Sequence, residues 1–499
     1  MMLAKVAAPA NVGMEGILVE VECDITNGLP AFVVVGLGNQ AINEARDRVR
    51  GAIRNSNLIL PPKRITLNLA PADLPKNGTA YDLSMAIAIL LASKQLEQAS
   101  DCLFVGELAL NGSLRPVGGM LAYAQLAANK QVSRLFVPAE NANEAALIEG
   151  VTVYGAKTLL DIYGHLMGLQ PLMATSRPTL SQGHGSSEAT TDFNRVYGQP
   201  EAKRVLEIAA AGGHNVLFSG SPGVGKTMVS RALIGILPPP SLPEMIEITK
   251  LHSLAGKSVG TVVHERPFRN PHHTASNIAL IGGGRSPKPG EISLSHHGVL
   301  FLDELPEFRR DVLEALRQPL EDGVVTVARA SGSVTFPAEF ILVAAQNPCP
   351  CGYAGDPVHL CSCNPATVTR YQRKVSGPLL DRIDMAVKVN RVDLSRIHRP
   401  EESSATIAAR VARARRHCYA NPNGTPRLNA RLGDQELRRA CKLTPAASQV
   451  LRTAMQTLQL SARSYVRTLK VARTIANLDG RTILQSEDIT EAVLYRPTG

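Results

Sequence analysis

The stretch that decides the fold runs from Asn215 to Thr227: Asn215-Val-Leu-Phe-Ser219 followed by Gly220-Ser-Pro-Gly-Val-Gly-Lys-Thr227. Its first five residues are typical of a buried strand, and Met228–Leu237 have the pattern of a helix. A glycine-rich loop in this position (the P-loop) turns backbone N–H groups inward, and the helix N-terminus adds a positive dipole end, so the loop suits phosphates. We expect Lys226 to reach the β- and γ-phosphates of ATP and the Thr227 hydroxyl to bind Mg²⁺. The predicted nucleotide-binding residues are Gly220, Ser221, Pro222, Gly223, Val224, Gly225, Lys226, Thr227 and Asp303.

Two carboxylates follow a second apolar strand. Val299–Leu302 is apolar, and Asp303 and Glu304 come directly after it. The carboxyl ends of parallel strands share one edge of a sheet, so both carboxylates should lie beside the P-loop. We expect Asp303 to hold Mg²⁺ together with Thr227, and Glu304 to polarise the attacking water. The alternative, an ordinary strand end with acidic residues, is disfavoured by the P-loop upstream.

Two further polar residues complete the predicted catalytic set. Asn347 follows the apolar strand Phe340–Ala345, where its side chain can orient the water near the γ-phosphate. Arg382 is the candidate to stabilise charge on the transferring phosphoryl group, often from a neighbouring subunit. The alternative for Arg382 is an ion pair with Asp381 or Asp384.

The pattern along the chain predicts an α/β protein in four parts. Residues 1–170 alternate short apolar runs with helical patterns, and residues 193–395 have the strand–helix alternation of a parallel-sheet domain. Residues 171–192 are rich in Ser, Thr, Pro and Gly and predict a flexible linker, whereas residues 396–499 predict a helical bundle. In the first part, the expected strands are 17–21, 32–35, 65–69 and 135–137, and the expected helices are 39–53 and 83–92.

Composition limits the partners. The 499-residue chain has a formal charge of +10, which is consistent either with polyanion binding or with a solvated basic surface. Aromatic residues make up only 4% and Trp is absent, so single-stranded bases would find few rings to stack on. No apolar run approaches the roughly 20 residues that span a bilayer, and the first residues lack a signal-peptide pattern, so we expect a cytoplasmic protein without a membrane partner. Four scattered cysteines, Cys23, Cys102, Cys418 and Cys441, are expected to be buried thiols.

The other four cysteines form a cluster. Cys349-Pro-Cys351 and Cys361-Ser-Cys363 enclose nine residues, in a Gly- and Pro-rich loop directly after Asn347. Four thiolates this close can hold a structural Zn²⁺ tetrahedrally. Four reduced thiols in a mobile loop are the alternative, and the spacing does not decide between the two.

The order of these motifs resembles that of the AAA+ ATPases. Arg266–Ser276, Ile281–Gly284, Pro289–Ser293 and His296–Phe308 look like the branch shared by magnesium-chelatase ATPase subunits and minichromosome-maintenance helicases. Within that branch the chain is most similar to the bacterial ComM family, called magnesium-chelatase-like, and the resemblance covers nearly the whole chain.

This resemblance implies two inserted hairpins, one before the acidic strand and one before the strand-tip Asn. Val324–Phe336 matches the second and has two alternating runs around a Gly-containing turn, which is a hairpin signal by itself. In related hexameric helicases such hairpins grip the DNA backbone, so Arg329, and with it Lys288, are implied to bind DNA. The alternative for Arg329 is a solvent-exposed turn residue.

The resemblance also implies roles at the two ends of the chain. The helical C-terminal part would be the AAA+ lid, with Arg463 as a second nucleotide-sensing arginine and Arg467, one turn later, as the alternative. The first part resembles the protease domain of Lon around Leu74–Leu83 and Leu114–Leu121. Ala80 stands where Lon has its Ser nucleophile, and no Lys follows the paired glycines, so peptide cleavage would lack both nucleophile and base.

The family implies a hexameric ring that uses ATP and Mg²⁺ to move along single-stranded or branched DNA. Its activity would be that of a helicase promoting branch migration during recombination in natural transformation, beside recombinase partners. A magnesium-chelatase-like motor that drives metal insertion with partner subunits is the alternative. A third interpretation, an ATP-dependent protease, is disfavoured by Ala80.

Overall fold

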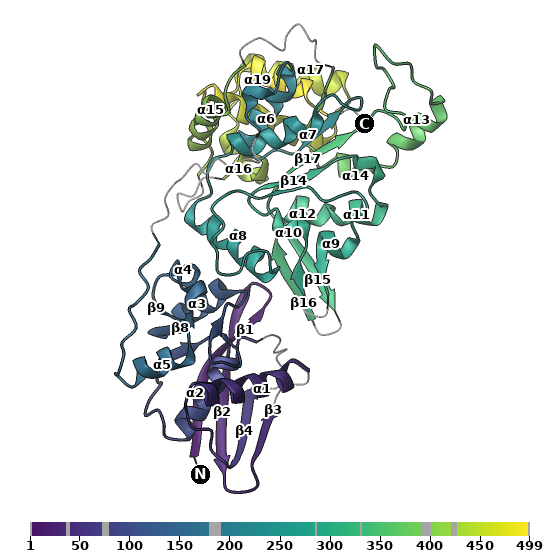
Figure 1. The fold of residues 1–499 in the computed structure, drawn as a ribbon. Helices are drawn as coiled ribbons and strands as arrows, with labels where there is room; N and C mark the ends of the chain where they lie inside the picture. Colours follow the sequence, from purple (N-terminus) through teal and green to yellow (C-terminus); the bar gives the residue numbers. More distant parts are fainter. Residues whose placement is uncertain are drawn as a thin grey trace.

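The computed structural model describes residues 2–35, 40–71, 79–178, 191–284, 287–329, 332–391, 401–420 and 427–497. Two bodies lie along one axis, with the N-terminus at the far end of the first and the C-terminus in the second (Figure 1). Part of the expected linker (179–190) and part of the Lon-like stretch (72–78) lie outside the described residues.

The first body is built on a seven-stranded sheet of order β3-β4-β2-β1-β5-β8-β9. The strands expected around residues 17–21, 32–35, 65–69 and 135–137 are confirmed, as are the two expected helices. The first strand was not predicted, although its whole length pairs antiparallel with residues 15–25 of the second strand. The elements are β1 (Met2–Val12), β2 (Glu15–Thr26), β3 (Ala31–Val35), α1 (Gln40–Asn55), β4 (Arg64–Ala70), α2 (Asp82–Ala92), β5 (Cys102–Phe104), β6 (Glu107–Leu108), β7 (Leu114–Arg115), α3 (Met120–Asn129), β8 (Arg134–Pro138), α4 (Ala142–Ala145), β9 (Thr152–Ala156) and α5 (Leu159–Leu166).

The second body has a parallel five-stranded sheet of order β11-β14-β17-β10-β18. Its central strands are apolar except for Ser219 and Gln346 at their carboxyl ends, because helices cover both faces, and this confirms the α/β class. Its elements are α6 (Pro200–Gly212), β10 (Val216–Ser219), α7 (Lys226–Ala232), α8 (Leu242–Leu254), β11 (Phe268–Arg269), α9 (Asn277–Ile281), α10 (Glu291–Leu294), β14 (Val299–Leu302), α11 (Arg310–Ala315), α12 (Arg317–Asp322), β17 (Ile341–Gln346), α13 (Pro365–Gln372), α14 (Gly377–Leu380) and β18 (Met385–Lys388).

The helical C-terminal region packs on one face of this sheet. Buried residues of the two form one apolar cluster, in which Val216 and Phe218 of β10 join Val411 and Ile475 of the helices. The helices therefore sit on the second body and do not form an isolated bundle. They are α15 (Ser404–Arg416), α16 (Asp434–Ala440), α17 (Pro445–Thr457), α18 (Ala462–Leu478) and α19 (Ser486–Leu494).

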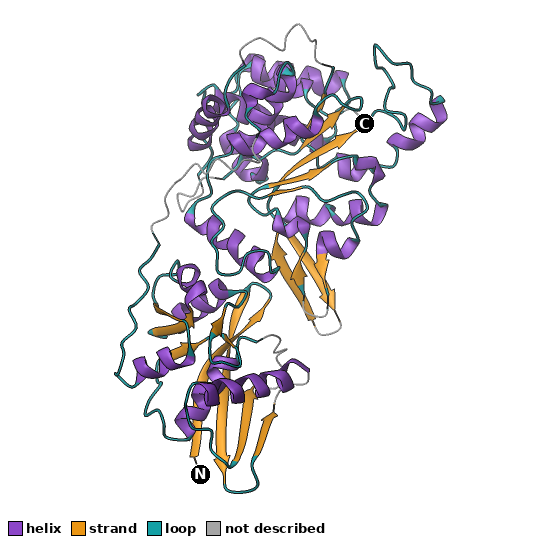
Figure 2. Ribbon diagram, viewed as in Figure 1, coloured by secondary structure: helices purple, strands orange, loops and turns teal. Residues whose placement is uncertain are grey.

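Two hairpins project from the second body, as the resemblance implied. The short pair β12 (Gly282–Gly283) and β13 (Lys288–Pro289) precedes β14. The longer pair β15 (Val324–Arg329) and β16 (Gly332–Pro337) precedes β17 and points toward the first body (Figure 2). A Cβ added at Gly13, in the β1–β2 turn, would lie 2.8 Å from Val334, so this hairpin touches the first body.

Helix α8 joins the two bodies. The Gly119 N–H, at the start of α3, donates to Ser253 Oγ over 2.8 Å. Glu144 accepts from the Gly260 N–H over 3.2 Å, and Leu242, Ile246 and Val262 pack on the apolar core of the first body. The first body is therefore docked on the segment between the P-loop helix and β11.

Within the part of the chain described, no helix is long and apolar enough to cross a membrane. Cys23, Cys102, Cys418 and Cys441 are free and buried, as expected.

Candidate nucleotide site

The P-loop joins β10 to α7 in the geometry that phosphate binding requires. Gly223 and Gly225 have φ values of 78° and 90°, which only glycine adopts without strain. Gly220 approaches the Val389 carbonyl so closely that a Cβ would lie 2.3 Å from its oxygen. The loop is thereby wrapped against the carboxyl end of the sheet, with Gly225 capping the helix that begins at Lys226.

Lys226 is buried at the centre of the site. Its ammonium donates to the Gly220 carbonyl over 2.7 Å, and to the Ser221 carbonyl and Asn347 Oδ1 over 3.0 Å each. Burial lowers the pKa of Lys226, while the nearby charges of Asp303 and Glu304 oppose that shift. The structure thus brings the P-loop lysine, the strand-tip Asn and the acidic pair into one site.

Thr227 and Asp303 form a hydroxyl–carboxylate pair. Thr227 Oγ1 donates to Asp303 Oδ2 over 2.8 Å, and Asp303 Oδ1 accepts from the Glu304 N–H over 2.9 Å. Hydroxyl and carboxylate oxygens are the donors that Mg²⁺ prefers, so the pair fits the ion expected here. Glu304 itself has φ 54°, and this left-handed turn at the strand end leaves its carboxylate half-exposed beside the P-loop.

His273 is a member of the site that sequence reasoning missed. Its Nδ1 lies 3.5 Å from Glu304 Oε2, and its ring lies 4.2 Å, centre to centre, from that of His272. The Arg266–Ser276 stretch was noted only for its resemblance, because spacing alone does not show that a residue 31 positions before Glu304 reaches it.

Arg382 and Arg463 meet at the other end of the sheet. Both guanidinium groups contact the Glu321 carboxylate, and the Asn215 side chain donates to the Arg382 carbonyl over 3.0 Å. Asn215 precedes β10, so at ~3.3 Å per residue this edge lies about 13 Å along the strand from Ser219, where the P-loop begins. The alternative expected for Arg382, an ion pair with Asp381 or Asp384, was wrong, because its guanidinium pairs with Glu321.

Arg467 has a different environment from Arg463. It donates to the Ile383 carbonyl over 2.7 Å and lies 3.5 Å from Asp381 Oδ1. Its side chain is 13% exposed, against 53% for Arg463. Arg467 thus braces the turn that carries Arg382, and Arg463 is the more accessible of the two.

The four clustered cysteines converge. Cys349 Sγ lies 3.3 Å from Cys351 Sγ and 3.7 Å from Cys361 Sγ, and Cys351 Sγ lies 3.6 Å from Cys361 Sγ. All four sulfur atoms, Cys363 included, lie within 4.8 Å of one another. Thiolates ~2.3 Å from a tetrahedral Zn²⁺ would be about 3.8 Å apart, so the donor set and its spacing fit zinc.

A second cluster of metal-ligating residue types, Glu247, His296 and His297, does not fit a metal. His296 Nδ1 accepts from the Glu339 N–H over 2.9 Å, so the ring proton sits on Nε2, which donates to Glu247 Oε2 over 2.9 Å. A metal-bound histidine donates with its other nitrogen instead. This cluster therefore ties α8 to the start of β14.

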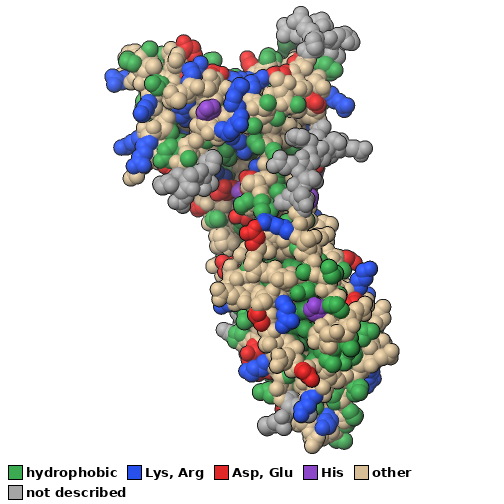
Figure 3. Space-filling model, turned by 90° about the vertical axis from the view of Figure 1, so that its left-hand side faces the viewer, with side chains coloured by type: hydrophobic (Ala, Val, Ile, Leu, Met, Phe, Trp, Pro, Cys, Tyr) green, Lys and Arg blue, Asp and Glu red, His purple; other side chains and the backbone are tan. Residues whose placement is uncertain are grey.

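The two DNA candidates lie on the hairpins. Lys288 is exposed on β13. Arg329 ends β15, and its side chain and the hairpin tip at 330–331 lie outside the described residues. Blue Lys and Arg side chains gather over the upper part of the face drawn in Figure 3. Residues 401–499 hold 16 Lys and Arg and 8 Asp and Glu, so they carry +8 of the formal +10.

The positions that correspond to the catalytic residues of Lon are buried. Ala80 is 6% exposed and Met120 is fully buried. The paired glycines Gly118 and Gly119 face the end of α8, where a Cβ on Gly118 would lie 3.0 Å from the Ser253 carbonyl oxygen. The surface on which a Lon-like lysine was sought is thus covered by the other body.

The parallel sheet, the P-loop and the acidic pair, with helices packed behind, define a P-loop protein of the AAA+ class. The chain is 44% identical to the competence protein ComM of Haemophilus influenzae over 99% of its own length and 98% of that protein. It belongs to the magnesium-chelatase-like family that includes ComM.

Family matches and further relatives agree with this assignment. The family described as magnesium chelatase, subunit ChlI, matches residues 192–397, with separate ChlI matches at residues 21–141 and a C-terminal one at residues 401–496. An uncharacterized Escherichia coli protein, YifB, is 44% identical over 99% of this chain and 97% of its own length. The magnesium-chelatase subunit ChlI of Euglena gracilis is 25% identical over 31% of this chain and 52% of its own length.

Proposed function

We propose that this chain is an ATP-hydrolysing motor that assembles into a hexameric ring and moves DNA. Its parts would be a Lon-like, proteolytically inactive domain (1–170), a linker (171–192), an AAA+ core (193–395) and a lid (396–499). The observation that carries the ring is the separation of the catalytic groups. Lys226 and Glu304 stand at the carboxyl edge of the sheet, whereas Arg382 and Arg463 stand at the amino edge. A head-to-tail ring joins the two edges of successive subunits.

Within each interface the groups divide the work. The P-loop N–H groups and Lys226 bind the phosphates, and Thr227 with Asp303 would hold Mg²⁺, which neutralises phosphate charge. Glu304 polarises the water and Asn347 orients it. The neighbouring subunit supplies Arg382 and Arg463 to the developing charge. Arg382 Nε is buried without a hydrogen-bond partner among the described residues. This donor is therefore free for the phosphoryl group of the neighbouring subunit's nucleotide, which supports the proposed role.

Three features support DNA as the substrate of the motor: the two hairpins, the positive charge of the lid and the similarity to ComM. The β15–β16 hairpin would carry Arg329 and the β12–β13 hairpin Lys288 into the channel, where they would hold phosphates. The basic lid, with exposed Arg413 and Arg416 on α15, adds a surface suited to a polyanion. The relative named for competence matches 99% of the chain, and this supports branch migration during natural transformation as the biological setting.

The test is DNA binding and strand displacement by Arg329→Ala on forked and three-stranded substrates. Bound phosphates release counterions, so the slope of log affinity against log salt should fall by about one unit for each phosphate that the variant no longer binds, whatever the DNA sequence. Basal ATP hydrolysis should persist. Arg309→Ala, which removes an exposed arginine on the same body, is the matched control. Unchanged affinity and unwinding in Arg329→Ala would exclude this hairpin as the DNA-gripping element.

A magnesium-chelatase-like motor is the second candidate, favoured by the matching family's description. The chelatase subunits themselves match about a third of the chain at 24–25% identity, which supports a shared ATPase core rather than a shared substrate. Wild-type protein that binds no DNA at low salt would make this candidate the better one.

The cysteine cluster is proposed to hold one structural Zn²⁺. Elemental analysis of protein purified without chelator should find about one zinc per chain, as one four-thiolate site implies. Purified protein that carries no metal would refute this proposal.

A further inference from the structure

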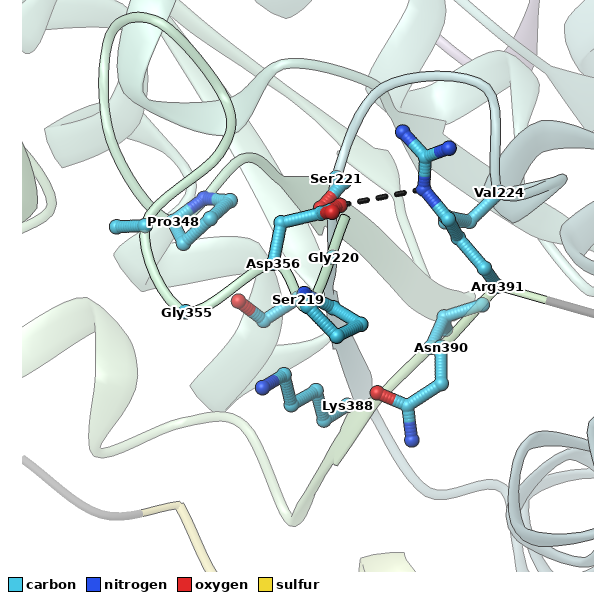
Figure 4. A pocket seen from close by; sticks show the side chains of 13 residues that line it. Ser219, Gly220, Ser221, Val224, Pro348, Gly355, Asp356, Lys388, Asn390 and Arg391 are labelled. Atoms are coloured by element: carbon cyan, nitrogen blue, oxygen red, sulfur yellow. Dashed lines mark hydrogen bonds and ion pairs between the residues drawn. The ribbon is translucent and has the colours of Figure 1, made fainter. Parts of the chain in front are cut away.

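The loop that carries the cysteines lies against the outer face of the P-loop. We call residues 349–363 the cysteine loop. Gly352 packs on Pro222, since a Cβ at Gly352 would lie 2.5 Å from the Pro222 ring. Figure 4 shows Gly355 and Asp356 of the cysteine loop beside Ser221 and Gly220 of the P-loop, around a pocket that Lys388 and Arg391 also line. Thirteen residues from three separate segments of the chain line this pocket.

Asp356 makes the polar contact between the two loops. Its carboxylate lies beside the Ser221 side chain (Figure 4) and accepts from Arg391 Nε over 3.2 Å. The same carboxylate accepts from the backbone N–H groups of Val358 and His359 over 2.9 and 3.0 Å. These donors, Ser221 first, hold the pKa of Asp356 well below its usual range, and the side chain is only 1% exposed. Asp356 is therefore an ionised acceptor that three donors hold in place beside Ser221.

Ser221 also contacts the phosphate-binding lysine of the P-loop, Lys226. Its carbonyl accepts from Lys226 Nζ over 3.0 Å, next to the Gly220 carbonyl. A shift of Ser221 would move both the P-loop backbone and the acceptor of Lys226. Asp356 touches no group of the acidic pair in the described structure, so it acts on the nucleotide only through the P-loop.

The cysteine loop has no apolar core to hold Asp356 in place. Leu360 is 96% exposed and Val358 is 66% exposed. The other contacts within the loop are few: the four thiols face one another, Cys349 Sγ accepts from the Ala354 N–H over 3.3 Å, and the Tyr353 ring lies 5.0 Å, centre to centre, from that of His359. A segment without a core depends on cross-links or metal for a single conformation.

We propose that Asp356 is a positioning residue for the P-loop, and that metal held by the four cysteines sets its position, so that metal loading of the cysteine loop controls affinity for the nucleoside triphosphate. This inference rests on the proposed ATP-binding function. It makes the chain's ability to bind nucleotide dependent on a thiophilic metal that takes no part in hydrolysis.

The test compares Asp356→Ala and Asp356→Asn with wild type in the full-length chain. Equilibrium binding of a fluorescent ATP analogue is measured together with metal content. Asp356→Ala should keep about one metal per chain, as a single four-thiolate site implies. It should bind the analogue roughly 10- to 100-fold more weakly, the effect of removing hydrogen bonds to a charged group. Asp356→Asn keeps an acceptor for Ser221 and should fall between the two.

Chelation distinguishes the effect of the metal from that of the Asp356–Ser221 contact. Removing the metal from wild type should weaken nucleotide binding as much as Asp356→Ala does, and chelating the Asp356→Ala protein should add little, because the two changes act through one interaction. Asp311→Ala is the matched control, since it breaks an Nε–carboxylate pair of the same 3.2 Å length with Arg309, on an exposed surface. It should change nothing.

Three results would overturn the inference: wild-type protein without metal, nucleotide affinity unchanged by chelation, or chelation that weakens Asp356→Ala as strongly as wild type. Metal-loaded wild type that binds no nucleotide would instead refute the proposed function itself.

Discussion

Replacing Arg382 by Ala tests the division of the catalytic site between subunits. An arginine that contacts the transferring phosphoryl group contributes roughly 10³–10⁵ in rate, so kcat for ATP should fall by at least about 10³-fold. Nucleotide binding should change much less than kcat, because such an arginine acts mainly on charge that develops in the transition state. Stability should fall by only about 1 kcal/mol or less, since the partner carboxylate of Glu321 is 46% exposed and such ion pairs contribute little.

The decisive assay mixes inactive subunits. In rings assembled from equal amounts of Arg382→Ala and Lys226→Ala chains, about one interface in four joins an intact P-loop to an intact arginine, because a head-to-tail interface takes one group from each neighbour. ATPase should return to about a quarter of the wild-type rate if interfaces act independently. No recovery in rings shown to contain both chains would refute action between subunits.

Glu321→Gln is the control for a purely structural role of Arg382. It removes the ion pair and keeps the guanidinium. If the pair with Glu321 were all that Arg382 provides, Glu321→Gln should lose activity as Arg382→Ala does. We expect it to keep most of its ATPase.

Three further outcomes are expected. Glu304→Gln should bind ATP and hydrolyse it very slowly, trapping the assembled ring; turnover near that of wild type, measured by phosphate release, would contradict the role of Glu304. Ala80→Ser should show no peptidase activity on casein. Met120 stands where a Lon-like lysine would activate the serine, and α8 covers that surface. Burial raises the pKa of Glu144 from 4.5 to about 7, because the buried site disfavours the charged carboxylate. The neutral carboxyl therefore makes its full contribution to stability below pH 4.5, and that contribution is lost as pH rises through 7. Glu144→Gln should flatten that part of the pH dependence of thermal unfolding between pH 5 and 8, and an identical slope in both proteins would contradict the assignment.

Local sequence determined the elements on which this protein is built. The P-loop could be recognised because a strand, a glycine turn and a helix start within thirteen residues, and backbone geometry over such a span depends on the residues themselves. The acidic pair, Asn347 and the helices of the C-terminal region followed from apolar periodicity for the same reason. The four cysteines could be grouped because they lie within one loop.

Only the tertiary structure decided which distant residues meet. Arg382 pairs with Glu321 and not with its sequence neighbours, because the turn before β18 packs beside the end of α12. His273 reaches Glu304, Asp356 reaches Ser221, and Gly119 meets Ser253 across 134 residues. Such contacts depend on how sheets and helices stack, which periodicity does not encode, since it reports which face of an element is buried and not what covers it. The strand β1 was missed in the same way, because its place in the sheet is set by pairing with β2 rather than by its own residues.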